Sequence, residues 1–277
     1  LDRDEVIRPG TTVETLGGGV SNVVLRVSTG HLGEVVVKQA LPRLRVEREW
    51  LADPVRTVTE ADALRVAASI DPSWVPEVLD IDVQRTVLVI RAAPPGVSDW
   101  KQILLRGDID NRIAHDLGWF LAHLHAATID IAGFDHDEQF EQLRLRPYFV
   151  AVAGRQADRA PALHAVCDTL RATRVCLVHG DASPKNVLIG PSTRWLIDFE
   201  VAHRGDPAFD VAFLCTHLVL KAIHLPEHRA AFLAAAQRFV AAYADANGPA
   251  LLDPTTTRLL GALLIARVDG DSPAEYL

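Results

Sequence analysis

The sequence predicts an α+β protein built from two lobes, a small one of antiparallel strands and a larger one that is mainly helical. Three observations predict it. Runs of β-branched residues alternate with glycine-containing turns through the first ninety residues. Residues 91–96 then bring two prolines and a glycine together, which cannot continue a central strand. Beyond them, apolar residues recur at steps of three and four. We therefore expect an N-terminal lobe at 1–90, a hinge at 91–96 and a C-terminal lobe at 97–277.

The first lobe is expected to be a sheet of antiparallel hairpins interrupted by one helix. The predicted helix covers Val58–Ala68, because Ala61, Leu64 and Ala68 fall on one face at helical spacing, and Thr59 is the expected cap. The predicted strands are Thr12–Thr15, Asn22–Val27, Glu34–Lys38, Leu79–Asp82 and Val87–Ile90.

The second lobe is expected to be helical, with two short strands inside it. An amphipathic helix is predicted where apolar residues form a stripe from Ile113 to Leu124. Further helices are predicted at Pro161–Arg171, Val211–Lys221, His228–Ala244 and Thr255–Ala266, and the strands at Val187–Ile189 and Trp195–Ile197.

Composition excludes several classes of function. The 28 Lys and Arg residues against 36 Asp and Glu give a net charge of −8, which disfavours a nucleic-acid partner. No apolar run approaches the roughly 18 residues that cross a bilayer, so we expect no membrane partner. Three cysteines without a Cys-x-x-Cys pair fit a reducing, cytoplasmic compartment. We expect a monomer or a homodimer.

Three polar residues among apolar, β-rich flanks carry the strongest chemical signal. Asp181 and Asn186 lie in Leu177–Ile189, and Asp198 follows the next predicted strand. Buried carboxylates need a cation or a donor beside them, and Mg²⁺ prefers oxygen ligands. We therefore expect Asn186 and Asp198 to hold Mg²⁺ together with nucleotide phosphates. Asp181, five residues before Asn186, would orient the substrate hydroxyl and accept its proton during phosphoryl transfer.

These motifs identify a family resemblance. His179-Gly-Asp181 stands where protein kinases have His-Arg-Asp, and Asp198-Phe-Glu200 where they have Asp-Phe-Gly. In both respects the chain resembles the aminoglycoside phosphotransferase and choline kinase superfamily. The resemblance implies a bilobal, protein-kinase-like fold, ATP and Mg²⁺ as cofactors, and transfer of the γ-phosphoryl group to a hydroxyl of a small molecule.

The first lobe contains the phosphate-binding parts that such a fold needs. A glycine-rich loop between two predicted strands would let backbone N–H groups approach phosphates. Lys38 ends the following strand and would reach the α- and β-phosphates. Its partner carboxylate is expected to be Glu60, in a segment resembling the superfamily's Glu-Ala-x-Ala-Leu helix, with Glu47 and Glu49 as alternatives. The loop residues expected to bind nucleotide are Gly17, Gly18, Gly19, Ser21 and Asn22.

The resemblance also assigns supporting roles. The backbone of Arg91 to Ala93 is expected to recognise the base, which leaves ATP and GTP as alternatives. Asp210 is expected to brace the catalytic loop, and Asp206 to cap a helix. Glu200 is expected to support a second Mg²⁺, and a hydrogen-bonding role behind the metal is the alternative.

The acceptor is less defined than the cofactor. Val37–Pro42, Arg56-Thr57 and Leu143–Tyr148 resemble the methylthioribose kinase branch, which implies a pentose-like sugar. The acidic residues Asp269, Asp271 and Glu275 would instead suit the amines of an aminoglycoside, whereas Arg267 favours a neutral sugar or a carboxylate. A non-catalytic nucleotide-binding regulator is the alternative function. A protein kinase is disfavoured because only about a dozen residues separate Asp198 from Asp210.

Overall fold

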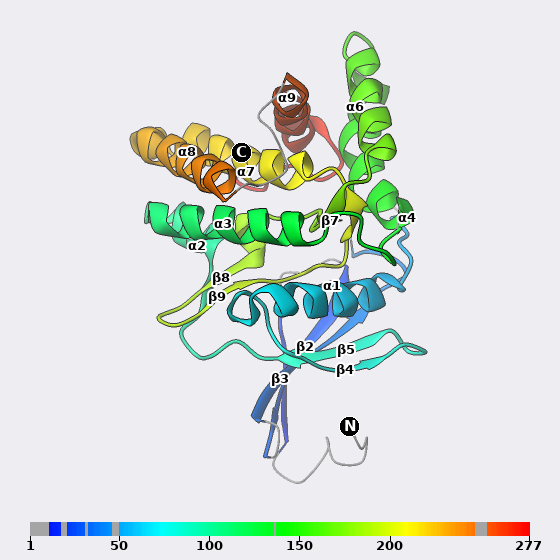
Figure 1. Ribbon diagram of the computed structural model, residues 1–277, viewed down its shortest axis with the longest axis vertical. Coiled ribbons are helices and arrows are strands. Elements are labelled where there is room, and N and C mark those ends of the chain that lie inside the picture. The colour runs from blue at the N-terminus through cyan, green and yellow to red at the C-terminus, as the bar shows by residue number, and fades with distance from the viewer. Residues whose placement is uncertain (1–10, 18–20, 31–32, 46–49, 136, 247–253) are drawn as a thin grey trace.

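The computed structural model describes residues 1–277 except 1–10, 18–20, 31–32, 46–49, 136 and 247–253. Its first part is a five-stranded antiparallel sheet in the order β1-β2-β3-β5-β4, with helix α1 packed on it (Figure 1). The strands are β1 (Thr12–Thr15), β2 (Asn22–Thr29), β3 (Gly33–Ala40), β4 (Val78–Asp82) and β5 (Val87–Arg91). The predicted antiparallel sheet is confirmed, and each predicted strand lies within an observed one or matches it.

Helix α1 (Arg56–Ile70) is longer than the predicted helix at both ends. Thr59 was predicted as its cap, and this was wrong. The residue is buried in the first turns of the helix, and its hydroxyl contacts Gln139 of the second lobe at 3.3 Å. The helix extends N-terminally through Arg56 and Thr57, which are both buried, and Arg56 hydrogen-bonds to backbone carbonyls that the sequence pattern does not reveal.

The second part is helical, with α8 lying against both α3 and α7 (Figure 1). All five predicted helices are present, as α3 (Asn111–Ala127), α6 (Ala160–Ala172), α7 (Ala208–His224), α8 (Arg229–Asp245) and α9 (Pro254–Asp269). The short strands are β6 (Ser98–Asp99), β7 (Cys176–Val178), β8 (Val187–Ile189), β9 (Arg194–Leu196) and β10 (His203–Gly205). The short helical turns are η2 (Pro72–Trp74), η4 (Pro184–Asn186) and η5 (Pro226–His228).

Two helical regions were not predicted. Helix α2 (Trp100–Leu105) begins at Asp99, whose carboxylate accepts a hydrogen bond from the Gln102 N–H at 2.9 Å. The other region runs continuously through α4 (Asp137–Phe140), the π-helical segment η3 (Glu141–Val150) and α5 (Ala151–Arg155). Pro147 lies inside it, and because proline lacks an N–H and crowds the preceding turn, the segment widens into a π-helix.

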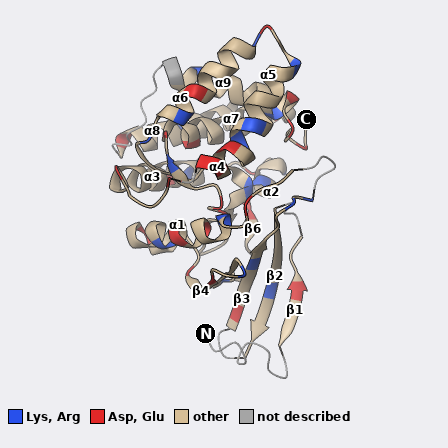
Figure 2. Ribbon diagram, turned by 90° about the vertical axis from the view of Figure 1, so that its right-hand side faces the viewer, with Lys and Arg blue, Asp and Glu red and all other residues tan. Residues whose placement is uncertain are grey.

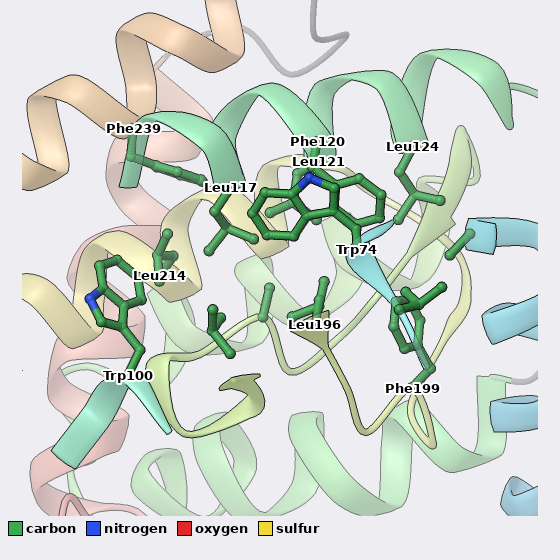
Figure 3. Packing of buried hydrophobic residues seen from close by; sticks show 14 of the residues in the cluster. Trp74, Trp100, Leu117, Phe120, Leu121, Leu124, Leu196, Phe199, Leu214 and Phe239 are labelled. Atoms are coloured by element: carbon green, nitrogen blue, oxygen red, sulfur yellow. The ribbon is translucent and has the colours of Figure 1, made fainter. Parts of the chain in front are cut away.

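The hydrophobic core does not stop at the predicted lobe boundary. One buried cluster joins Leu64 of α1 and Leu88 of β5 to Trp100, Phe120 and Phe199 of the second part. Figure 3 shows this cluster from close by, with Trp74 packed against α3. The rings of Trp74 and Phe120 are stacked with centroids 4.9 Å apart. The two lobes therefore share apolar packing in addition to the chain connection at 91–96.

A second cluster lies around η3, α6, α7 and α9 and also takes in Leu44 and Ala52 from the first lobe. Cys167 and Cys176 belong to it, whereas Cys215 belongs to the first cluster, and all three cysteines are buried and unpaired. In the described part of the chain no single helix suffices to span a membrane, although α7 and Pro226–Asp245, which meet at a bend of 118°, pass the length and composition test together.

Candidate active site

Lys38 lies at the centre of a buried ion-pair cluster. The alternation of β3 places Lys38 on the same face as Val36 and Ala40, and the residue is only 7% exposed. Its Nζ lies 2.7 Å from Oε1 of Glu60 in α1 and 2.8 Å from Oδ1 of Asp198. Burial opposes the charge on Lys38, but these two carboxylates outweigh it and raise the pKa of the lysine. Lys38 therefore keeps its positive charge at neutral pH.

Of the three carboxylates considered for Lys38, the structure pairs it with Glu60. Glu60 is 2% exposed, on the face of α1 that packs against the sheet. Glu47 and Glu49 lie outside the described residues. The two ion pairs of Lys38 connect β3 with α1 and with the segment after β9. Glu60 is 22 positions from Lys38 along the chain, and Asp198 is 160 positions away.

The loop after β7 carries Asp181. Gly180 in this loop has a φ of +74°, and a Cβ there would meet the Val201 carbonyl oxygen at 2.8 Å, so only glycine fits without strain. The buried carboxylate of Asp210 accepts hydrogen bonds from the N–H groups of His179 at 2.7 Å and Gly180 at 2.9 Å. Asp210 thus holds the loop through its backbone.

Further contacts hold this loop from behind. The His125 Nε2 lies 3.2 Å from Oδ2 of Asp210, and its Nδ1 lies 2.8 Å from the Tyr243 hydroxyl. Burial lowers the pKa of His179, whose Nδ1 accepts from the Asp181 N–H at 3.0 Å while Nε2 donates to the Ile197 carbonyl at 3.1 Å. A neutral imidazole in one tautomer satisfies both bonds.

The Asp181 carboxylate is surrounded by cations. Its Oδ2 lies 3.0 Å from Nη2 of Arg144 in η3 and 3.0 Å from Nζ of Lys185. Burial favours the neutral acid, but Arg144 and then Lys185 outweigh it, so the pKa of Asp181 lies below its usual range. The carboxylate is ionised at neutral pH and able to accept a hydrogen bond from a hydroxyl.

The predicted metal donors lie beside this carboxylate. The Ile197 N–H donates to the Asn186 carbonyl at 2.9 Å, which places Asn186 next to the chain leading into Asp198. Asn186 Nδ2 donates to the Asp181 carbonyl at 2.9 Å, so its side-chain oxygen is left for another partner. Asp198 has a φ of +71°, and its Oδ1 is taken by Lys38. The two side chains together offer hard oxygen donors.

Glu200 has a different set of contacts. Its Oε2 accepts hydrogen bonds from Arg56 Nε at 3.0 Å and from Asn22 Nδ2 at 2.9 Å. Among the described residues, no three of His, Cys, Asp and Glu gather closely enough to hold a metal by themselves. A metal ion held here would therefore take one or two ligands from these residues and the others from phosphates.

Arg56 connects the glycine loop to the rest of the site, and sequence reasoning assigned it no role. It is completely buried and reaches Glu200, the Ser21 carbonyl at 2.6 Å and the Leu41 carbonyl at 2.8 Å. Two more carbonyls, of Ala52 and Asp53, accept from its Nη1 at 3.0 Å each. Nothing in the local pattern around Arg56-Thr57 distinguishes this arginine from a surface one, apart from the stated resemblance.

Arg144 was also missed as a site residue, although its segment carried the same resemblance. It is 8% exposed, donates to the Gly180 carbonyl at 2.6 Å and pairs with Asp181. Ser183, to which no role was assigned, is buried, and its hydroxyl has no partner within the described residues. The π-helical geometry of η3 brings Arg144 to the loop, and neither spacing nor composition predicts that geometry.

The nucleotide-binding residues of the first lobe are partly described. Gly17 is exposed, Gly18 and Gly19 lie outside the described residues, and the Ser21 hydroxyl accepts from Asn22 at 3.0 Å. In the predicted hinge, the Arg91 N–H donates to the Glu77 carbonyl at 2.9 Å and the Ala93 carbonyl accepts from Arg26 at 3.1 Å. The Ala92 N–H also donates to the Glu34 carbonyl at 3.1 Å, so three of the hinge backbone groups are used within the protein.

The comparisons with known proteins fit this geometry. Residues 12–257 match the model of the phosphotransferase enzyme family, APH, which is most of the chain. The chain belongs to this family. Curated relatives are methylthioribose kinases, one from Bacillus cereus at 25% identity over 77% of this chain and 62% of its own length, and one from Bacillus mycoides at 26% identity over 79% and 63%. The chain thus spans about three fifths of the length of these relatives.

Solved structures of other kinases have a similar fold. An amicoumacin kinase in complex with AMP-PNP and Ca²⁺ superposes with a TM-score of 0.62 at 17% identity, covering 92% of this chain and 79% of its own. An aminoglycoside-3′-phosphotransferase of type VIII gives 0.55 at 23%, covering 92% and 94%. A choline/ethanolamine kinase family protein from Mesorhizobium loti gives 0.51 at 17%, covering 91% and 90%. The predicted kinase-like fold is confirmed.

Proposed function

We propose that this family member is an ATP-dependent small-molecule kinase, which transfers the γ-phosphoryl group of ATP to a hydroxyl of its acceptor. The observation that supports it most is that three separate segments bring together Lys38, which pairs with Asp198, and Asp181, whose carboxylate lies within electrostatic reach of Asp198. Phosphoryl transfer needs positioning and charge neutralisation more than covalent help. The site meets those needs. It offers a buried cation for the phosphates, oxygen donors for a metal ion and an ionised carboxylate for the acceptor hydroxyl.

Mg²⁺ fits the donors present. The side-chain oxygen of Asn186 and the second carboxylate oxygen of Asp198 are hard ligands of the kind that Mg²⁺ prefers. When bound, the ion would neutralise charge on the transferred phosphoryl group. Glu200 fits its alternative role better, because Arg56 and Asn22 already occupy its Oε2. We propose it as a link between the glycine loop and the segment of Asp198.

The chain's own residues have distinct parts in the proposed reaction. Lys38 binds the α- and β-phosphates while Glu60 keeps its ammonium in place. Asp181 orients the acceptor hydroxyl and takes its proton as the phosphoryl group is transferred. Asp210 keeps the Asp181 loop in register through the two N–H groups it accepts from. The base would be bound by the backbone at 91–93.

Cellular context belongs to the same proposal. The three unpaired cysteines suit a cytoplasmic enzyme, and a small-molecule acceptor needs no nucleic-acid or membrane partner. A monomer or homodimer is proposed. The pentose of the methylthioribose kinase relatives, and an aminoglycoside as in one structural neighbour, are the acceptor classes to compare.

The first test is the Asp181→Asn variant. We expect nucleotide affinity to be largely kept and turnover to fall by about 10²–10⁴-fold, the range for removing a general base. Binding of AMP-PNP with Mg²⁺ by calorimetry and ADP release with and without acceptors measure the two effects. Asp198→Ala should instead remove the Mg²⁺-dependent part of nucleotide binding.

The outcome separates the two functions. Acceptor-stimulated ADP release that Asp181→Asn abolishes identifies an enzyme. Turnover near the wild-type value in Asp181→Asn would show that this carboxylate is not the base. Nucleotide binding with no ADP release above the variant on any hydroxyl compound would favour the non-catalytic regulator.

A further inference from the structure

A chain of cationic and aromatic side chains leads away from Asp181 into the helical lobe. Arg144, which pairs with Asp181, places its guanidinium 5.7 Å from the ring centroid of Tyr148 and 5.8 Å from that of Phe213. Arg267 of α9 lies 5.5 Å from the same Tyr148 ring, and its Nη1 is 3.3 Å from the Tyr148 hydroxyl. Two guanidinium groups thus share one buried tyrosine next to the catalytic loop.

Helix α7 continues this chain. Phe213, His217 and Lys221 are spaced by four residues, so they line one side of the helix. Lys221 is completely buried, with Nζ 3.2 Å from the Tyr276 hydroxyl and 4.6 Å from the centroid of its ring. Its other polar contact is the His217 carbonyl at 3.5 Å. Among the described residues, no carboxylate forms an ion pair with it.

The carboxylates around Lys221 and Arg267 already have partners. Glu275 is exposed and pairs with Lys101 at 2.6 Å, and Asp99 caps α2. Asp269 accepts from Gln156 at 2.5 Å, and Asp271 pairs with Arg155. The acidic residues that would suit the amines of an aminoglycoside are therefore bound to the protein's own donors.

An excess of positive charge is left beside the proposed phosphoryl-transfer site. The cationic group consists of Lys101, Arg144, Lys185, Lys221 and Arg267, whereas the whole protein is acidic. Glu275 pairs with Lys101, and Asp181 pairs with both Arg144 and Lys185, so the five cations face two paired carboxylates. Figure 2 shows acidic and basic positions interspersed along the ribbon. Arg267 Nε is buried without a partner in the described part of the chain. Burying such donors is costly unless a ligand satisfies them.

We propose that the acceptor of this kinase carries, besides its hydroxyl, an anionic group, a carboxylate or a phosphate, bound by Lys221 and Arg267. This inference rests on the proposed function, whose site it deepens. An oxyanion would supply the opposite charge that Lys221 lacks and would accept a hydrogen bond from Nε of Arg267, whose Nη1 already donates to Tyr148 and Ser272. Tyr148 and Tyr276 would flank it with ring and hydroxyl. A polycationic acceptor would be repelled by the same groups.

Burial of Lys221 agrees with this assignment. Desolvation, reinforced by Lys101 and Arg267, lowers its pKa to about 7. An anion bound at Lys221 would favour the protonated lysine. A purely structural lysine gains nothing from such a position, because a methionine would fill the same space without a charge.

Binding to the protein preloaded with AMP-PNP and Mg²⁺ tests the proposal independently of turnover. Calorimetric titrations use four probes of matched size or known charge: ribose 5-phosphate, ribonate, ribose and kanamycin. We expect ribose 5-phosphate or ribonate to bind at least tenfold more tightly than ribose, and kanamycin not to bind. Comparison of the two anions distinguishes a phosphate from a carboxylate.

The variants Lys221→Met and Arg267→Met should each weaken the anionic probe at least tenfold. Arg238→Met removes an exposed cation from α8 and should leave the affinity unchanged. The proposal is overturned if neither anionic probe binds more tightly than ribose, if kanamycin binds, or if both variants keep the wild-type affinity. Failure of the proposed function would show differently, as no binding of AMP-PNP at all or no effect of Asp181→Asn on ADP release.

Discussion

At the scale of single residues, the site depends on buried charges that compensate one another. Lys38 is matched by Glu60 and Asp198, and Arg56 by Glu200. Each of these side chains would be costly to bury alone. The arrangement therefore ties the geometry of the nucleotide site to the stability of the fold, since loss of one partner leaves the other uncompensated.

Arg56→Met is the sharpest test of this link. We expect a loss of about 3–5 kcal/mol in the free energy of unfolding, because Glu200 would remain buried without its partner. Urea denaturation followed by circular dichroism measures it. Arg65→Met, which removes an exposed arginine of the same helix, should change stability by less than about 0.5 kcal/mol.

The double variant Arg56→Met with Glu200→Gln separates pairing from packing. It should recover part of the loss, because a neutral amide is less costly to bury than an uncompensated carboxylate. Equal stability of the single and double variants would show that the four hydrogen bonds from Arg56 to backbone carbonyls, and not its pairing with Glu200, carry the effect.

At the scale of elements, the loop after β7 is fixed from several sides at once. Asp210 of α7 holds its N–H groups, His125 of α3 holds Asp210, and Tyr243 of α8 holds His125. Three helices thus converge on one loop of a few residues. The position of Asp181 is determined by the packing of those helices.

Gly180→Ala tests how tightly this loop is fixed. The substitution meets both an unfavourable φ of +74° and the Val201 carbonyl at 2.8 Å, whereas Gly33→Ala meets a φ of +71° in open space. Backbone strain alone costs about 1–3 kcal/mol. We expect Gly180→Ala to be destabilised beyond Gly33→Ala and to lose ADP-release activity. Equal losses in thermal denaturation would mean that the loop moves away from Val201.

The sequence predicts the elements of this fold well and their convergence poorly. Periodicity locates the strands and the long helices because it records which face is buried. It does not reveal α2 or η3, since one is short and the other bends around Pro147. Arg56 and Arg144 were missed as site residues because their contacts are not local in the sequence. Their carboxylate partners, Glu200 and Asp181, lie far away along the chain, and local spacing contains no information about such distant contacts.

At the scale of the whole molecule, burial of Lys221 predicts a pH dependence of stability. The unfolded lysine keeps its proton to about pH 10.4, whereas the folded one releases it near pH 7. Between these values the unfolded state binds more protons, so this group makes stability rise with pH. Below about pH 7 both states bind this proton, and the buried charge then destabilises the fold to its full extent. Lys101, Arg267, Asp99, His217 and Tyr276 are the charged or titratable groups around it.

Lys221→Met should remove this dependence. The variant is expected to be more stable than the wild type at pH 6.5, and the difference should shrink as the pH rises towards 10. Urea denaturation at pH 6.5, 8 and 9.5 measures the free energy of unfolding of both proteins. The buried cysteines titrate in both, so their contribution cancels in the difference. A difference that stays constant with pH would show that Lys221 keeps its proton in the folded state throughout the range.

The three buried thiols provide a direct reporter of how the molecule opens. Burial raises the pKa of Cys167 to about 11 and that of Cys215 to about 12, so neither thiol reacts at neutral pH until water reaches it. Cys215 belongs to the first cluster, which joins α1 and β5 to α3, and Cys167 belongs to the second cluster, around η3. Their rates of labelling by a thiol reagent therefore compare the opening of the two clusters. If nucleotide slows the labelling of Cys215 more than that of Cys167, nucleotide binding restricts the opening of the first cluster.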